Sequence, residues 1–77
     1  MSEKVAIELY VIERVKEMRV AKGFTQASLA EALGYSEGFI GHIENPKRRD
    51  KYNLKHLNEI AKLFKCSIKE FVPDQPL

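Results

Sequence analysis

The segment TQASLAEALGYSEGFIGHIE, residues 25–44, is the feature that most constrains the fold, because it reads as two short helices joined by a tight turn. Thr25 and Ser36 stand where helix N-caps are needed, since a hydroxyl oxygen can accept a hydrogen bond from a free backbone N–H. Gly34 stands where the first helix must end, because glycine adopts a left-handed C-cap conformation at no steric cost. The segment therefore predicts helices over residues 26–33 and 37–44.

Both predicted helices carry apolar residues at the spacing of one helix face. Leu29, Ala30 and Leu33 share a face of the first helix, and Ile40 and Ile43 share a face of the second. A tight pair of helices that each bury one face is the helix-turn-helix arrangement of DNA-binding proteins. The second helix, residues 37–44, is therefore the candidate reader of a DNA groove.

Length and composition limit the chain to one small domain. It has 77 residues, of which 44% are hydrophobic and 31% are charged, a balance typical of a folded domain. The formal net charge of +2 is too small to indicate nucleic acid by itself. The single cysteine, Cys66, permits neither an internal disulfide nor a thiolate metal cage, and we expect it to be a small, at least half-buried side chain.

Several classes of protein are not expected from this sequence. Charges interrupt the apolar runs near the start of the chain, so neither a signal peptide nor a membrane span is predicted, and we expect a cytoplasmic protein. His42 and His56 have no cysteine or carboxylate at metal-ligand spacing. No Ser-His-Asp order or glycine-rich phosphate loop is present. We therefore expect no enzymatic activity, no cofactor and no metal site.

Two longer helices are predicted on either side of this segment. The first begins at Glu3 or Val5 and ends at Lys22, before Gly23. Its core stripe at three-residue spacing is Leu9, Ile12, Val15 and Met18. The second covers residues 54–64 and has Asn53 as its N-cap. Its core stripe is Leu54, Leu57, Ile60, Ala61 and Phe64.

A short last helix completes the predicted fold. Ser67 and Glu70 have the spacing of a capping box, and the helix that they begin would turn Ile68, Phe71 and Val72 inward. The predicted fold class is all-α, with five helices and no strands in a single domain over residues 1–77. Its helix-turn-helix covers residues 25–44, a helical extension covers residues 2–11, and an extended or frayed tail covers residues 73–77.

The outward positions of the second helix are the candidate base-reading set. With Ile40 and Ile43 in the core, the outward residues are Glu37, Gly38, Gly41 and His42, with Phe39 at the edge. Glu37 can accept a hydrogen bond from a cytosine amino group, and Phe39 can pack on a thymine methyl group. His42 can reach a base edge or a phosphate. Two simpler interpretations stay open: Glu37 only favours the positive helix N-terminus, and Phe39 belongs to the core.

Gly38 and Gly41 are unusual in a reading helix, because each costs up to about 1 kcal/mol of helix stability relative to alanine and offers no side chain. One interpretation is a very close approach of the helix backbone to DNA, with sequence read through DNA shape. The other is a surface with a weaker role in base reading that serves a protein partner. We favour the first.

Phosphate contacts are expected on both sides of the reading helix. Gln26 and Ser36 stand at helix starts, where side chains and backbone N–H groups can bind a phosphate. A cluster of cations follows the reading helix directly: Lys47, Arg48, Arg49 and Lys51, around a single Asp50. Such a cluster can bind the phosphates of the DNA backbone. A run of charged residues that stands alone, however, usually forms only a solvated loop.

The segment from Ile12 to Phe71 resembles the lambda-repressor-like, Cro/Xre-type helix-turn-helix family. The resemblance is carried by IERVKEMRVAKGFTQASLAEALGYSEGFIGHIEN and HLNEIAKLFKCSIKEF, with TQ opening the second helix, LA followed by LG, and IEN closing the third. It implies the five-helix fold and a partly buried ion pair between Arg19 and Glu44. It also implies that Gln26 contacts a phosphate or base, that residues 37–42 include the recognition positions, and that Lys47 to Arg49 contact the DNA backbone.

The resemblance further implies a homodimer on a palindromic operator, and three departures qualify it. Pro46 stands where the family often has glycine, and the recognition positions contain two glycines, which argues against strong base-by-base reading. Residues 2–11 extend the usual first helix as a dimer contact, a partner site or a harmless extra turn. The leading hypothesis is that the protein is a transcriptional regulator that binds double-stranded DNA in a sequence-specific manner and acts as a repressor. The alternative is an antitoxin that neutralises a toxin or other partner protein and autoregulates its operon.

Overall fold

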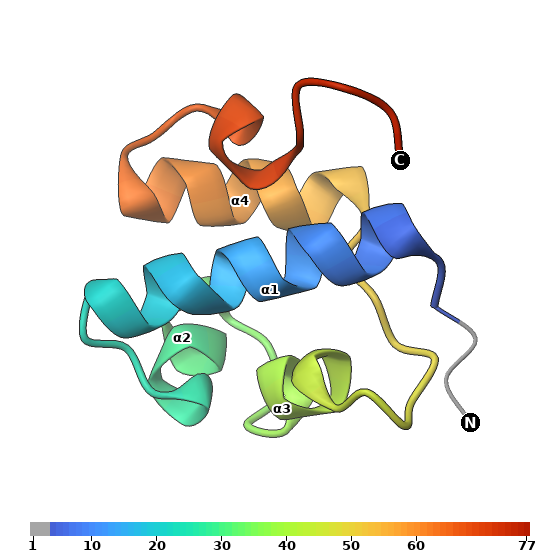
Figure 1. The fold of residues 1–77 in the computed structure, drawn as a ribbon. Helices are drawn as coiled ribbons and strands as arrows, with labels where there is room; N and C mark the ends of the chain where they lie inside the picture. Colours follow the sequence, from blue (N-terminus) through green and yellow to red (C-terminus); the bar gives the residue numbers. More distant parts are fainter. Residues whose placement is uncertain (1–3) are drawn as a thin grey trace.

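The chain folds into an all-helical domain built around its first helix. The computed structural model describes residues 4–77, and no strand occurs among them. The elements are α1 Ala6–Ala21, α2 Gln26–Leu33, α3 Phe39–Glu44, α4 Leu54–Phe64 and the 3₁₀ turn η1 Ile68–Phe71. In Figure 1, α1 crosses the middle of the molecule. On one side of it lie α4 and η1, and on the other side lie α2 and α3. The predicted all-α fold class is therefore confirmed.

Local signals set most of the helix ends. The Thr25 hydroxyl accepts a hydrogen bond from the Ser28 N–H at 2.9 Å, and Gly34 ends α2 in the left-handed region with φ +81°. The Asn53 side chain caps α4 in the same way, accepting from the His56 N–H at 2.8 Å. These caps and the bounds of α2 and α4 agree with the sequence-based predictions, because each signal acts within three residues of the helix end.

The start of α3 differs from its prediction. The helix begins at Phe39, two residues later than expected, and its N-cap is Gly38, which has no side chain to cap it. Ser36 is not the N-cap: its carbonyl oxygen, rather than its hydroxyl, accepts from the Phe39 N–H at 3.0 Å. Glu37 therefore lies in the turn before α3. The hydroxyl was the expected acceptor, but the backbone closes this turn by itself.

The last helix is a single 3₁₀ turn without the predicted capping box. The Ser67 hydroxyl accepts from the Lys69 N–H at 3.1 Å, while the Glu70 carboxylate lies 3.5 Å from the Arg14 guanidinium. Phe71 is fully buried, but Ile68 and Val72 are 36% and 37% exposed, so the prediction that all three point inward was wrong for two of them. One short turn has room to bury only one large side chain.

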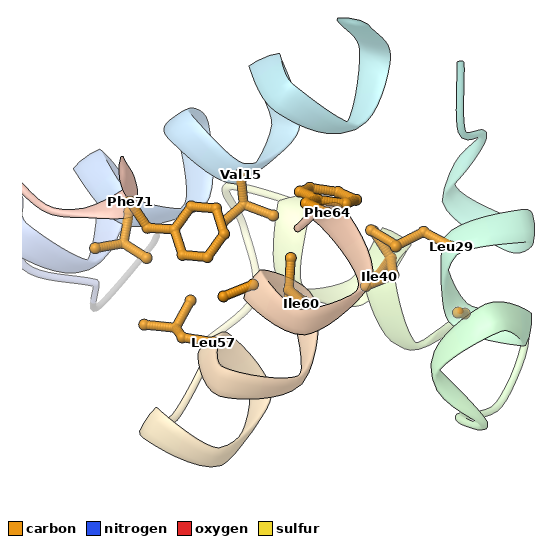
Figure 2. Close-up of a cluster of buried hydrophobic side chains, with 10 residues drawn as sticks. Val15, Leu29, Ile40, Leu57, Ile60, Phe64 and Phe71 are labelled. Atoms are coloured by element: carbon orange, nitrogen blue, oxygen red, sulfur yellow. The ribbon is translucent and has the colours of Figure 1, made fainter. Parts of the chain in front are cut away.

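Side chains from every helix meet in one core. Figure 2 shows this cluster and labels Val15, Leu29, Ile40, Leu57, Ile60, Phe64 and Phe71. Two residues predicted for this core lie outside it, since Leu9 is 44% exposed and Leu54 is 79% exposed. On α1, Val11 is buried instead of Leu9. The helix turns Val11, Ile12 and Val15 inward together, and this rotation places Leu9 at the surface.

The hydroxyl of Tyr52 is buried, and among the described residues it has no hydrogen-bond partner. Burial is the main cause of a raised pKa for this phenol, with the nearby Glu44 carboxylate adding to it. A buried polar group without a partner costs desolvation energy that its removal recovers. Tyr52→Phe is therefore expected to leave the free energy of unfolding unchanged or to raise it by about 1 kcal/mol.

Urea unfolding of Tyr52→Phe beside Tyr10→Phe measures this effect, because Tyr10 is 40% exposed and its hydroxyl should contribute little. A stability loss in Tyr52→Phe well above that of Tyr10→Phe would show that the buried hydroxyl makes a stabilising bond.

Candidate nucleic-acid interface

The outer face of α3 brings together most of the predicted base-reading residues. Ile40 and Ile43 are 0% and 2% exposed and anchor the inner face of the helix. Gly38 and His42 are exposed and Gly41 is half-buried, so the three lie on the outer face. Glu37 is exposed in the preceding turn rather than on the helix itself. The face is therefore accessible and almost without projecting apolar side chains.

Phe39 lies at the edge of this face and packs inward. Its ring stacks on Tyr35 with 4.3 Å between centroids and meets the His56 ring edge-on at 4.9 Å. The side chain is half-buried and packs against the hydrophobic core. These contacts favour the interpretation in which Phe39 belongs to the core.

Arg19 and Glu44 form a buried ion pair that joins α1 to the end of α3. Two parallel hydrogen bonds connect them, from Arg19 Nε to Glu44 Oε2 at 2.8 Å and from Nη2 to Oε1 at 2.9 Å. The side chains are only 8% and 3% exposed. Arg19 also donates to the carbonyl oxygen of Phe24 at 2.8 Å, so its guanidinium is well satisfied. This pair fixes the position of α3 against the core.

Gln26 joins the same network from the first position of α2. Its Nε2 donates to Glu44 Oε1 at 2.9 Å, which places the exposed carboxamide beside α3. A Cβ atom at Gly41 would lie 2.9 Å from Gln26 Oε1, closer than real Cβ contacts. A Cβ atom at Gly38 would lie 3.4 Å from the His42 ring, an ordinary contact. A side chain at position 41 would therefore displace the Gln26 carboxamide, a coupling that the sequence-based interpretations did not include.

The basic loop after α3 has a defined shape. Asn45 is extended with φ −75° and ψ 116°, as expected before Pro46, and its side-chain oxygen accepts from the Lys47 N–H at 2.9 Å. The Asn45 carbonyl oxygen accepts from the Arg48 N–H at 3.1 Å. These bonds hold the backbone of residues 45–48 in a turn directly after α3.

The loop cations differ in their partners. Arg48 Nε donates to Asp50 at 2.7 Å, and this hydrogen bond lowers the pKa of the Asp50 carboxyl group. Lys51 lies 2.8 Å from Glu8 of α1, and its hydrogen bond lowers the pKa of Glu8. Lys47, Arg48 and Arg49 are exposed. Lys51 is thus tied to α1, while the other three lie nearer to α3 in sequence.

Lys4 is a residue of this region that the sequence-based predictions missed. Its ammonium group donates to the carbonyl oxygens of Ile43 at 2.7 Å and Asn45 at 2.8 Å, and the residue is only 9% exposed. A cation at a helix C-terminus is favourable, but these partners lie about forty positions away in the chain. The described start of the N-terminal extension therefore supports the end of α3.

Two classes of feature are absent from residues 4–77. No helix there is both long and apolar enough to cross a membrane. In the same residues, no group of three or more histidine, cysteine or acidic side chains could hold a metal ion.

Comparison with known proteins identifies the family. The model of a helix-turn-helix family matches residues 15–71, most of the chain. The crystal structure of the restriction-modification controller protein C.AhdI from Aeromonas hydrophila is similar, with a TM-score of 0.66 and 26% sequence identity over 82% of this chain and 94% of that chain. No curated protein matches the sequence. The chain belongs to the Cro/C1-type helix-turn-helix family, and it is a DNA-binding transcriptional regulator.

Proposed function

We propose that this protein is a repressor that binds a palindromic operator as a homodimer and recognises its sequence through the outer face of α3. The observation that carries the proposal is the accessible face of Gly38, Gly41 and His42, followed directly by the ordered loop with Lys47 and Arg48. The likeness to a controller protein supports a regulatory role. Because its target is DNA, we propose that it acts in the cytoplasm.

The outer face of α3 fits the major groove, where an α-helix can reach base edges. His42 is the exposed side chain on this face that can reach a base or phosphate, and Glu37 and Ser36 approach from the preceding turn. Lys47, Arg48 and Arg49 follow the helix and would neutralise phosphates beside the groove. The two parts have separate roles, since phosphate contacts supply affinity and base contacts supply specificity.

A titration of labelled operator at several salt concentrations tests the phosphate contacts. Each phosphate neutralised steepens the log–log salt dependence of binding by about 0.9, so Lys47→Ala and Arg48→Ala should each reduce the slope by about 1. Lys62→Ala on α4 is the control, because it removes an exposed cation outside the proposed interface. A protein that shows no sequence preference at low salt, or a Lys62→Ala effect equal to the others, would contradict the proposal.

The homodimer is proposed to form around Leu54. This side chain is 79% exposed and lines an apolar hollow of about 210 Å³ together with Ile7 of α1 and Val72. A two-fold axis here would place the leucine of each copy in the hollow of the other, because such interfaces are self-complementary. The exposed leucine of a small domain with a thin core then becomes buried surface.

Sedimentation equilibrium measures this assembly. Leu54→Asp is expected to give a monomer, while Leu9→Asp, which alters another exposed leucine that does not line the hollow, should remain a dimer. A dimer that survives Leu54→Asp would contradict this interface. Co-purification with an unrelated protein in place of a second copy would favour the antitoxin alternative.

A further inference from the structure

We propose that Gln26 of α2 reads an adenine in the operator, lying across Gly41 so that one base-reading side chain comes from outside α3. The inference rests on the proposed function, since it requires the outer face of α3 to enter the major groove. Of the phosphate and base contacts that the sequence leaves open for Gln26, it assigns the base edge and names the base.

The Gln26 carboxamide lies against Gly41, on the outer face of α3. A Cβ atom at position 41 would lie 2.9 Å from Gln26 Oε1 and 3.7 Å from its Cδ. The carboxamide therefore fills the volume that any other residue at position 41 would occupy. Because Gly41 lies on the outer side of α3, opposite the buried Ile40 and Ile43, the carboxamide becomes part of the reading surface.

Glu44 fixes which end of the carboxamide is the donor. A carboxylate bound to the Arg19 guanidinium can only accept hydrogen bonds, so the amide nitrogen of Gln26, and not its oxygen, must face Glu44. The 2.9 Å hydrogen bond from Gln26 Nε2 to Glu44 Oε1 has this orientation. The Glu44 side chain is only 3% exposed and accepts two hydrogen bonds from Arg19, so it is a rigid support. The amide is thereby oriented before any DNA is bound, which lowers the entropic cost of recognition.

The groups that remain match one base. After the bond to Glu44, Gln26 keeps one N–H donor and its carbonyl oxygen as acceptor. In the major groove, adenine presents an acceptor at N7 and a donor at N6, whereas guanine presents two acceptors there and cytosine a donor at N4. A phosphate only accepts, so it would use the N–H donor alone and leave the carbonyl oxygen to water. The donor and acceptor pair of Gln26 is therefore best used by adenine.

Three variants separate this role from a structural one. Gln26→Ala removes the carboxamide, and Gly41→Ala displaces it by steric contact. The displaced atom is the end of a flexible side chain, so Gly41→Ala should still fold. Asn58→Ala is the matched control, because it removes an exposed carboxamide from α4, outside the proposed interface. Thermal unfolding of each variant confirms that the domain is intact.

The experiment selects operators from random duplexes with the wild-type protein and then replaces single bases. Wild type should lose roughly tenfold to a hundredfold in affinity when one adenine is exchanged for another base, or for 7-deazaadenine, which lacks the N7 acceptor. Gln26→Ala and Gly41→Ala should be insensitive to both exchanges, while Asn58→Ala should keep the wild-type response.

The failures of the two proposals are distinguishable. If Gln26→Ala weakens binding to all sequences equally, Gln26 contacts a phosphate and the inference is overturned while the proposed function stands. If Gly41→Ala keeps the adenine preference, the position of Gln26 over Gly41 is not what sets it, and the inference is again overturned. If wild type itself has no sequence preference, the proposed function fails, and this inference fails with it.

Discussion

Replacing Arg19 by methionine is expected to lower the free energy of unfolding by roughly 3–5 kcal/mol, because it leaves the Glu44 carboxylate buried without its cation. A domain of this length has only about 4–12 kcal/mol of stability in total, so much of it would be lost. Guanidinium chloride unfolding followed by circular dichroism measures the change. The reason for the large effect is the burial of both side chains, which removes water as a substitute partner.

Two further variants make the test of this ion pair specific. Arg14→Met removes a cation from the same helix. The ion pairs of Arg14 with the Glu17 and Glu70 carboxylates are exposed and 3.5 Å long, and its Nε donates to the Glu70 carbonyl oxygen at 2.9 Å, so the change should cost about 1 kcal/mol, well below the loss from Arg19→Met. Arg19→Met combined with Glu44→Met should be far more stable than the sum of the two single changes predicts, because no charge is then stranded. Additive effects would show that the two side chains do not depend on each other.

Phe71→Ala is expected to lower the free energy of unfolding by roughly 3–5 kcal/mol. The ring is fully buried and packs against Phe64 with 6.4 Å between centroids, so its loss opens a cavity between η1 and α4. Ile68→Ala in the same turn is the matched control, since Ile68 is 36% exposed and should cost far less. Urea unfolding measures both changes. Equal losses of unfolding free energy from the two variants would contradict the claim that burial of Phe71 holds η1 against α4.

Features that depend on neighbours in the chain could be predicted from the sequence. Thr25 and Asn53 each cap a helix through a backbone N–H three residues away, and Gly34 ends a helix through its own backbone angles. The core residues of α3 followed from helical spacing alone, as Ile40 and Ile43 show. Local rules failed at Ser36, where the backbone closes the turn and the hydroxyl is not used.

Features that depend on distant contacts could not be predicted. Three-residue spacing gave Leu9 a core position, but the rotation of α1 is set by its packing partners, which bury Val11 instead. Lys4 reaches the end of α3 only in the folded chain. The outer face of α3 was predicted as a set of residues, but the close approach of Gln26 to Gly41, from fifteen positions earlier and on another helix, could not be.

The network of Arg19, Glu44 and Gln26 connects the stability of the domain to its proposed reading surface. The guanidinium holds the carboxylate inside the protein, and the same carboxylate orients the carboxamide at the surface. Changes at Glu44 should therefore alter both unfolding and sequence preference, whereas changes at Phe71 should alter unfolding alone.

The most direct test of the central claim is a map of backbone amide chemical shifts in ¹⁵N-labelled protein titrated with its selected operator. The largest changes are expected at Gln26 and across residues 36–49, which hold the turn before α3, its outer face and the basic loop. Little direct change is expected at residues 58–66 of α4 and the segment after it. Changes concentrated on α4 and η1, with residues 36–49 unaffected, would contradict the account.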